Sequence, residues 1–428
     1  MELPFDIGEI GLRGQSALGL VVFTFIAWLF SSAKLRFPIG IVISTIIAQL
    51  VIAWLMLYLP PARQALASLQ VAVDALEQST RAGTSFVFGF LGGAEPPFAV
   101  TNQPAMFNFA FGALPLVIFF SGLSALLWYI GVLKIIVKAL AFLLTRIFGI
   151  GGAVALAAAS NIFLGQTESP LLIRPYLSKL SRAELFNVIT VGYATVAGSV
   201  MVVYAAVLAH VDPSVLGHII VASIISVPAA ILMSQVMMPD PKGVAPTRAD
   251  AADDFRYAGP MDAFMRGVTD GLGLYLNIIA SLIAFTAFVA LINIILAGAP
   301  QLMGEPLTIQ GVLGVIFAPF MWLAGVPWSE AFEAGKLMGV KTAINELVAY
   351  IELGKVPEGT FSERSFLIVV YSLCGFANFA SLGIMIGGLT ALAPDRRQDV
   401  IDLAPRALIS GTLATLMAGS IIGIIWVG

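Results

Sequence analysis

Three consecutive polar residues, Gln166, Thr167 and Glu168, stand in an otherwise apolar part of the chain. The residues before them, GIGGAVALAAA at 149–159, and those directly after Pro170 would suit the interior of a lipid bilayer. An ionisable side chain is costly there unless it faces a partner, a ligand or water. The stretch therefore indicates a functional site rather than a plain membrane span.

A second stretch of this kind lies in the other half of the chain, KTAINELVAY at 341–350, where Asn345 and Glu346 are adjacent. An amide donates and accepts hydrogen bonds, whereas an ionised carboxylate only accepts them. Two amide–carboxylate pairs in interrupted hydrophobic segments, one in each half, are typical of a secondary transporter whose site lies between repeats.

The composition excludes an ordinary soluble globular protein. Hydrophobic residues make up 59% of the chain and charged residues 11%, and the mean hydropathy is +0.96. The net charge of −3 gives no indication of nucleic-acid binding. The single cysteine, Cys374, excludes an intramolecular disulfide. We therefore expect an all-α polytopic membrane protein.

We predict eight transmembrane helices from apolar runs of about 20 residues. They lie at 17–30, 38–59, 113–132, 185–209, 215–237, 271–296, 365–392 and 407–427. Two further segments, 150–180 and 331–355, are too interrupted by polar residues to be plain spans. Pro170 and Pro175 break the first of them. Both segments are predicted to be re-entrant helical hairpins, because irregular backbone at membrane depth is tolerated only inside protein or beside a water-filled cavity.

The spans at 185–209 and 365–392 each have small and polar residues at their centre, including Thr195, Gly198 and Ser199 in the first. Such a helix can unwind and free its carbonyl oxygens for an ion, although small residues also serve close helix packing. A hairpin followed by a broken helix occurs in each half, which indicates inverted repeats.

These elements divide the chain into four parts. Residues 1–132 hold the N-terminal spans and an interfacial amphipathic helix at 62–78. Residues 133–237 form the first repeat and residues 263–428 the second. A polar cytoplasmic connector, 238–262, joins the repeats.

The distribution of Lys and Arg predicts the orientation. Basic residues cluster at 34–36, 134–146, 174–182, 242–266 and 396–406. Placing these clusters in the cytoplasm puts both termini on the outer, periplasmic side. The basic amphipathic helix at 130–148 would then lie on the cytoplasmic surface.

At three stretches the sequence resembles the concentrative nucleoside transporter family. They are NIFLGQTESP at 161–170, GVK at 339–341 with NELVAY at 345–350, and CGFAN at 374–378 extended to Ser381. The similarity covers the chain from about residue 86 to its end. It implies a bacterial inner-membrane symporter, not an enzyme, that imports uridine and related nucleosides on the sodium gradient by elevator-like alternating access.

The resemblance also implies a homotrimer whose subunits have a scaffold domain, largely 1–132, and a moving transport domain, with no cofactor beyond the coupling ion. The residues that it implies for the nucleobase are Gln166, Thr167, Glu168 and Val200. Those for the ribose are Glu346, Phe376, Asn378 and Ser381. Those for sodium are Asn161, Leu164, Thr167, Thr195 and Val196. Lys341 and Asn345 are interpreted as caps or salt partners that hold the second hairpin.

Other interpretations stay open. An ion channel would ring a water path with carboxylates, but it does not account for an amide beside each acid. A membrane enzyme would use Glu168 or Glu346 as a base, but no nucleophile, metal cluster or phosphate cradle accompanies them. A proton-coupled nucleoside symporter would carry its proton on one of these glutamates, and the sequence is compatible with either ion.

Overall fold

The computed structural model describes residues 7–101, 106, 108–240, 246–247, 257–298 and 307–427. Every regular element within these ranges is a helix. Seven helical segments in the described residues are long and apolar enough to cross a membrane. They are α1 (Ile7–Leu29), α2 (Ile39–Tyr58), η3 (Phe109–Ala113) with α4 (Leu116–Tyr129), α9 (Arg182–Ala194) with α10 (Gly198–Leu208), α11 (Val215–Met237), α12 (Pro260–Leu296), and η4 (Pro394–Arg396) with α18 (Arg397–Ile425).

The helices differ sharply in how far the protein covers them. In the most apolar stretch of α11, 83% of the residues are buried, against 6% in that of α12. Ile283, Phe288 and Ile294 of α12 are 58–72% exposed. So large an apolar surface must contact lipid or another protein chain. The centre of the fold is thus formed by α9, α11 and α18, which pack on one another.

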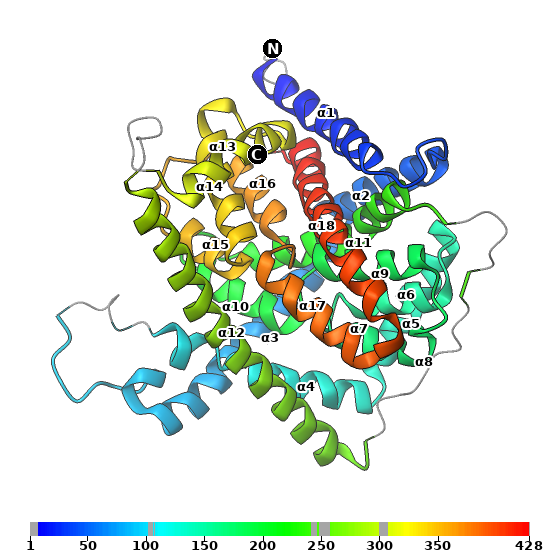
Figure 1. The fold of residues 1–428 in the computed structure, drawn as a ribbon. Helices are drawn as coiled ribbons and strands as arrows, with labels where there is room; N and C mark the ends of the chain where they lie inside the picture. The colour runs from blue at the N-terminus through cyan, green and yellow to red at the C-terminus, as the bar shows by residue number, and fades with distance from the viewer. Residues whose placement is uncertain are drawn as a thin grey trace.

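At one edge of the molecule the long helix α12 lies against α4 (Figure 1). The two helices pack antiparallel through small residues. A Cβ atom on Gly267 would lie 2.5 Å from the carbonyl oxygen of Ser121, and one on Gly271 would lie 2.8 Å from the Ser121 side chain. Such close backbone approach is typical of helix pairs in membranes. The helices associate there through van der Waals packing, and small residues allow the backbones to come close together.

The segment 150–180 is a helix, a turn and two short helices. They are α6 (Gly152–Ser160), α7 (Glu168–Leu171) and α8 (Arg174–Leu177), preceded by α5 (Val132–Phe148). The returning arm lies against the first, because the Ser169 hydroxyl donates to the carbonyl of Ala157 at 2.9 Å. The arm is divided in two before Pro175, which has no N–H to continue the helix from α7.

The segment 331–355 contains α14 (Trp328–Ala343) and α15 (Glu346–Leu353). Asn345 caps α15, since its Oδ1 accepts from the Val348 N–H at 2.9 Å. Ahead of α14 the chain forms another regular helix, α13 (Ile309–Ala324). It packs antiparallel on α14, where a Cβ atom on Gly335 would lie 2.5 Å from the Gly314 carbonyl.

Two helices are interrupted in the middle. The chain leaves helical geometry at 195–197, between α9 and α10, and at 374–378, between α16 (Glu363–Leu373) and α17 (Phe379–Leu392). Neither α16 nor α17 has the length of a membrane span, so the predicted span 365–392 is built from both. The two interruptions lie against each other, because Gly375 packs onto the carbonyl oxygens of Tyr193 and Ala194.

Several helices extend beyond the predicted apolar runs. The helix predicted at 62–78 is α3 (Pro60–Phe88), followed by η1 (Gly89–Gly92), and α12 begins at Pro260 instead of 271. Hydropathy detects only the part of a helix that lies in lipid, whereas polar pairs continue the helix outside it; Arg266 and Asp262 form such a pair at 2.9 Å. Most of the predicted connector, 238–262, is outside the described residues.

Candidate functional site

A cavity of about 110 Å³ lies where the tips of both hairpins meet α10, α12 and α17. All eight residues expected to contact a substrate line it: Gln166, Thr167, Glu168, Val200, Glu346, Phe376, Asn378 and Ser381. Its other lining residues include Tyr204, Leu274, Asn277 and Asn345. Tertiary folding therefore gathers into one place side chains that are more than 200 residues apart in sequence.

Both oxygen atoms of the Glu346 carboxylate accept hydrogen bonds in this cavity. Its side chain is buried, its Oε1 accepts from the Tyr204 hydroxyl at 2.6 Å, and its Oε2 accepts from the Asn378 amide at 2.7 Å. The other end of that amide is also held, because Asn378 Oδ1 caps α17 by accepting from the Ser381 N–H at 2.7 Å. Both carboxylate oxygens are thus oriented, and each keeps a lone pair for a further donor.

Tyr204 belongs to the site although the sequence does not single it out. It lies in α10 one turn after Val200, so both side chains are on the same helix face. That spacing is the available signal, but a tyrosine in an apolar helix is more often a packing residue. The ring of Tyr204 also packs on the ring of Tyr350, with their centroids 4.8 Å apart.

The helices that carry these residues present their N-terminal ends to the cavity. Val200 lies in the first turn of α10, Glu346 begins α15, and Ser381 lies in the first turn of α17. Helix N-termini carry partial positive charge from unpaired N–H groups. This charge stabilises the buried carboxylate of Glu346 and favours electron-rich atoms of a bound molecule.

The first hairpin contributes an unpaired acceptor. Gln166 is buried and lines the cavity, and its Oε1 has no hydrogen-bond partner in the described protein. Glu168 is half-buried and closes the turn, since its Oε2 accepts from the Gly165 N–H at 3.1 Å. A buried polar atom without a partner is costly, so Gln166 is ready to accept from a ligand.

Two of the residues expected to bind an ion meet where the end of α6 lies against the interruption after α9. Asn161 is buried, and its amide nitrogen donates to the Thr195 hydroxyl and, at 3.1 Å, to the Val191 carbonyl. Asn161 Oδ1 is buried with no hydrogen-bond partner in the described chain. Val196 follows Thr195 in the interruption, and Leu164 and Thr167 lie in the hairpin turn. Uncharged oxygen atoms of this kind suit a hard monovalent cation.

A larger cavity of about 490 Å³ adjoins the first and shares Thr167, Glu168, Leu274, Asn277 and Ile384 with it. It extends between α4 and α12 towards Trp128 and Tyr257. Burial, and then the nearby Asp270 carboxylate, raise the pKa of Tyr257 to about 12, so its hydroxyl is neutral at physiological pH. The small cavity thus continues into a wider space beside α12.

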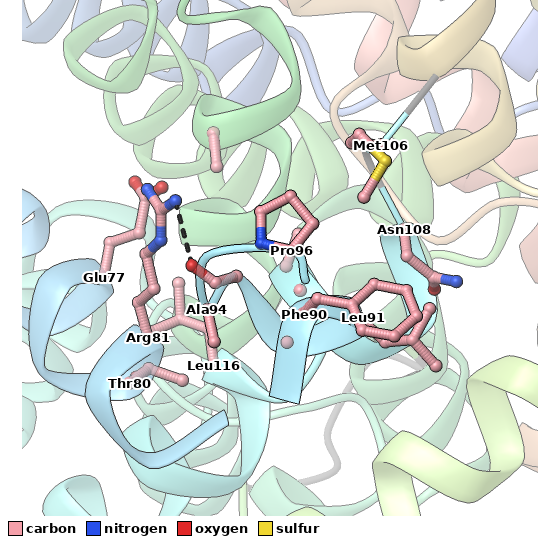
Figure 2. A pocket seen from close by; sticks show the side chains of 15 residues that line it. Glu77, Thr80, Arg81, Phe90, Leu91, Ala94, Pro96, Met106, Asn108 and Leu116 are labelled. Carbon is pink, nitrogen blue, oxygen red and sulfur yellow. Dashed lines mark hydrogen bonds between the residues drawn. The ribbon is translucent and has the colours of Figure 1, made fainter. Parts of the chain in front are cut away.

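A separate cavity of about 300 Å³ lies between α3, η1 and η3 (Figure 2). Arg81 on its wall donates to the Gly93 carbonyl at 3.3 Å. None of the residues predicted to bind a substrate or an ion lines it. It is therefore not part of the candidate site.

Three family models match successive parts of the chain. The model described as "Na+ dependent nucleoside transporter N-terminus" matches residues 18–91, "Nucleoside recognition" matches 110–211, and "Na+ dependent nucleoside transporter C-terminus" matches 218–423. The last two models together contain every residue proposed above for substrate and ion.

Similar proteins are known along nearly the full length. An uncharacterized transporter of Haemophilus influenzae is 38% identical over 96% of this chain and 97% of its own. The nucleoside permease NupC of Helicobacter pylori is 34% identical over 96% and 97%. The structure of CNTnw in an inward-facing substrate-bound state superposes with a TM-score of 0.87, at 36% identity over 96% of this chain and 98% of that one.

Proposed function

Because this chain belongs to the Na+-dependent nucleoside transporter family, whose members are transporters and not enzymes, we propose that it is a symporter that imports nucleosides on the sodium gradient. The observation that carries the proposal is the doubly held carboxylate of Glu346 in a cavity shared by both hairpins. A ribose presents neighbouring hydroxyl donors, and a fixed carboxylate is a suitable acceptor for them.

The remaining polar groups divide between the two ends of a nucleoside. Asn378 and Ser381, with Phe376 beside them, lie around Glu346 and are proposed to face the ribose. Gln166, Thr167, Glu168 and Val200 are proposed to face the nucleobase. The edges of a base carry donors and acceptors, and the unpaired Oε1 of Gln166 is free to accept from one of them. Uridine and related nucleosides fit this division.

Sodium is the proposed coupling ion. The support is the unpaired, buried Oδ1 of Asn161, whose amide nitrogen donates to the Thr195 hydroxyl. Leu164, Thr167 and Val196 would complete the ligands. The alternative is proton coupling through Glu168 or Glu346, since a buried carboxylate can carry a proton.

The assembly of the subunits and the movement of their domains are also proposed from the membership of this family. The chain is a membrane protein, and we propose a bacterial inner-membrane location with both termini in the periplasm. The exposed apolar surface of α12 supports contact with lipid or with neighbouring subunits of a homotrimer. The hairpins and interrupted helices would form the moving transport domain, and the N-terminal helices would form most of the scaffold.

Uptake into proteoliposomes tests the proposal. An inward sodium gradient should drive accumulation of labelled uridine, and choline in place of sodium should abolish it. Uptake that persists in choline and rises at low external pH would replace sodium by a proton. A failure to accumulate any nucleoside with either ion would contradict the transport function itself.

A further inference from the structure

The larger cavity beside α12 carries polar and aromatic groups that the proposed substrate site does not use. Its volume of about 490 Å³ lies within the range of about 300–1,000 Å³ that is usual for ligand sites. The described residues on its wall include two carboxylates, Glu168 and Asp270, and no basic side chain. The charged groups of this wall are therefore acceptors, which suits a ligand with several O–H or N–H donors.

Asp270 lines the larger cavity but not the smaller one. Leu274 and Asn277 line both cavities and follow Asp270 by four and seven residues, so the three side chains share one face of α12. Seven residues of helix span about 10 Å, which separates Asp270 from the substrate cavity. Its carboxylate forms no ion pair within the described chain, and Arg266, one turn before it, pairs with Asp262 at 2.9 Å.

Two aromatic residues, Trp128 and Tyr257, lie on the wall of the same cavity, and neither is among the described residues that line the smaller one. Trp128 is in the last turn of α4, and Tyr257 lies three residues before α12 begins. The ring of Tyr257 packs edge-on against that of Tyr129, with their centroids 6.4 Å apart. An aromatic face can stack on any nucleobase, because every base has a π-face.

We propose that the larger cavity is a second nucleoside-binding site, which is occupied independently of the site at Glu346. The ribose hydroxyls donate to the Asp270 carboxylate, and the base lies against Tyr257 and Trp128. In the proposed orientation the end of α4 and the start of α12 face the cytoplasm, so a nucleoside that leaves Glu346 meets this second site on its way out. The inference rests on the proposed transport of nucleosides.

The number of bound uridine molecules gives the first test. Equilibrium dialysis of purified wild-type protein against labelled uridine in sodium buffer should show two uridine molecules per chain at saturation. The second should bind more weakly than the first, because Asp270 is not held in place as Glu346 is. One uridine per chain, with sodium-driven uptake intact, would overturn the second site and leave the proposed function standing. No nucleoside binding at all would contradict both.

Substitutions of carboxylates locate the two components of binding. Asp270→Asn keeps the shape of the side chain but removes its charge, so the weak component should weaken by about fivefold to tenfold and the tight one should not change. Glu346→Gln should have the reverse effect. Asp262→Asn is the matched control, because this carboxylate is on the same helix but does not line the cavity, and it should change neither component. If Asp270→Asn leaves the weak component unchanged, or lowers both components equally, the inference is wrong.

A pair of substitutions at Tyr257 tests the aromatic contact. Tyr257→Leu removes the ring and should weaken the weak component by about fivefold to a hundredfold. Tyr257→Phe keeps the ring and should preserve that component. An equal loss in both variants would contradict stacking of the base in this cavity. If the variants do not fold, the number of uridine molecules bound to the wild-type protein still decides.

Discussion

The backbone N–H of Phe376 donates to the carbonyl oxygen of Thr195 at 3.3 Å. Each residue lies in the interruption of its own helix, so the two interruptions are joined directly by their main chains. Asn161 binds the Thr195 hydroxyl on one side of this contact, and Phe376 lines the substrate cavity on the other. The proposed ion site and the cavity are thus connected through one hydrogen bond.

We predict that the close contact between the two interruptions requires a glycine at Gly375. A Cβ atom there would lie 2.9 Å from the carbonyl oxygens of both Tyr193 and Ala194 and 2.7 Å from the Thr415 methyl group. Gly375→Ala should lower the free energy of unfolding by about 1–3 kcal/mol through overpacking, measured as thermal stability in detergent. Gly383→Ala, which meets no atom within 4 Å, is the control and should cause no loss. Equal stability of the two variants would contradict close packing between the two interruptions.

Glu346→Gln should strongly reduce uridine uptake, because a neutral amide is a weaker acceptor for ribose hydroxyls than a carboxylate. Wild type should also bind a deoxyribonucleoside more weakly when the missing hydroxyl is one that Glu346 contacts. Uptake into proteoliposomes measures the first effect, and calorimetry with purified protein and a series of deoxyuridines measures the second. Equal binding of uridine and every deoxyuridine would remove the ribose assignment.

Tyr204→Phe should weaken the binding of ribonucleosides. The lost hydroxyl leaves Glu346 Oε1 without its 2.6 Å donor, and hydrogen bonds to charged groups contribute about 1.5–3 kcal/mol, or about tenfold to a hundredfold in affinity. Tyr350→Phe is the matched control, because that hydroxyl donates to the Val370 carbonyl and not to Glu346. It should lower stability but preserve the preference for ribose. The same loss of preference in both variants would argue that Tyr204 acts only through packing.

Gln166→Ala should weaken nucleoside binding by about tenfold to a hundredfold, because the nucleobase loses one hydrogen-bond partner. The size of the loss should depend on which base is offered. Ser381→Ala should weaken all ribonucleosides alike. Binding of uridine, cytidine and adenosine to both purified variants measures the difference. If Gln166→Ala lowers the affinity for every base by the same factor, Gln166 is structural and other residues determine base selectivity.

Asn161→Ala should weaken the sodium dependence of uridine binding, since it removes an unpaired buried oxygen from the proposed ion site. The loss of one buried polar ligand costs about 1–3 kcal/mol, which raises the sodium concentration needed for half-maximal binding by about fivefold to a hundredfold. Ser160→Ala is the control, because its hydroxyl donates only to Ala157 in its own helix. An unchanged sodium requirement in Asn161→Ala would show that the ion binds elsewhere.

The sequence by itself determined the class of the protein and the position of its polar segments. Membrane spans can be recognised without the fold, because the thickness of the bilayer sets the length of apolar sequence that a transmembrane helix needs. Polar residues inside such runs are costly wherever they lie, so the apolar surroundings of Glu168 and Glu346 in the sequence are enough to make them candidates. Asn345 is predicted to have a structural role, and it caps α15.

The tertiary structure decided which of these groups meet. Its spacing from Val200 does not by itself mark Tyr204 as a site residue, and its hydroxyl donates to Glu346 across 142 positions of sequence. Lys341 is predicted to be a cap or a salt partner, and its ammonium binds the Ser372 carbonyl in the last turn of α16 and the Thr415 hydroxyl of α18. A buried polar atom must find a partner, but its own sequence neighbourhood does not specify that partner. The partner depends on how the whole chain packs, because the packing brings particular helix ends within hydrogen-bond distance of the polar atom.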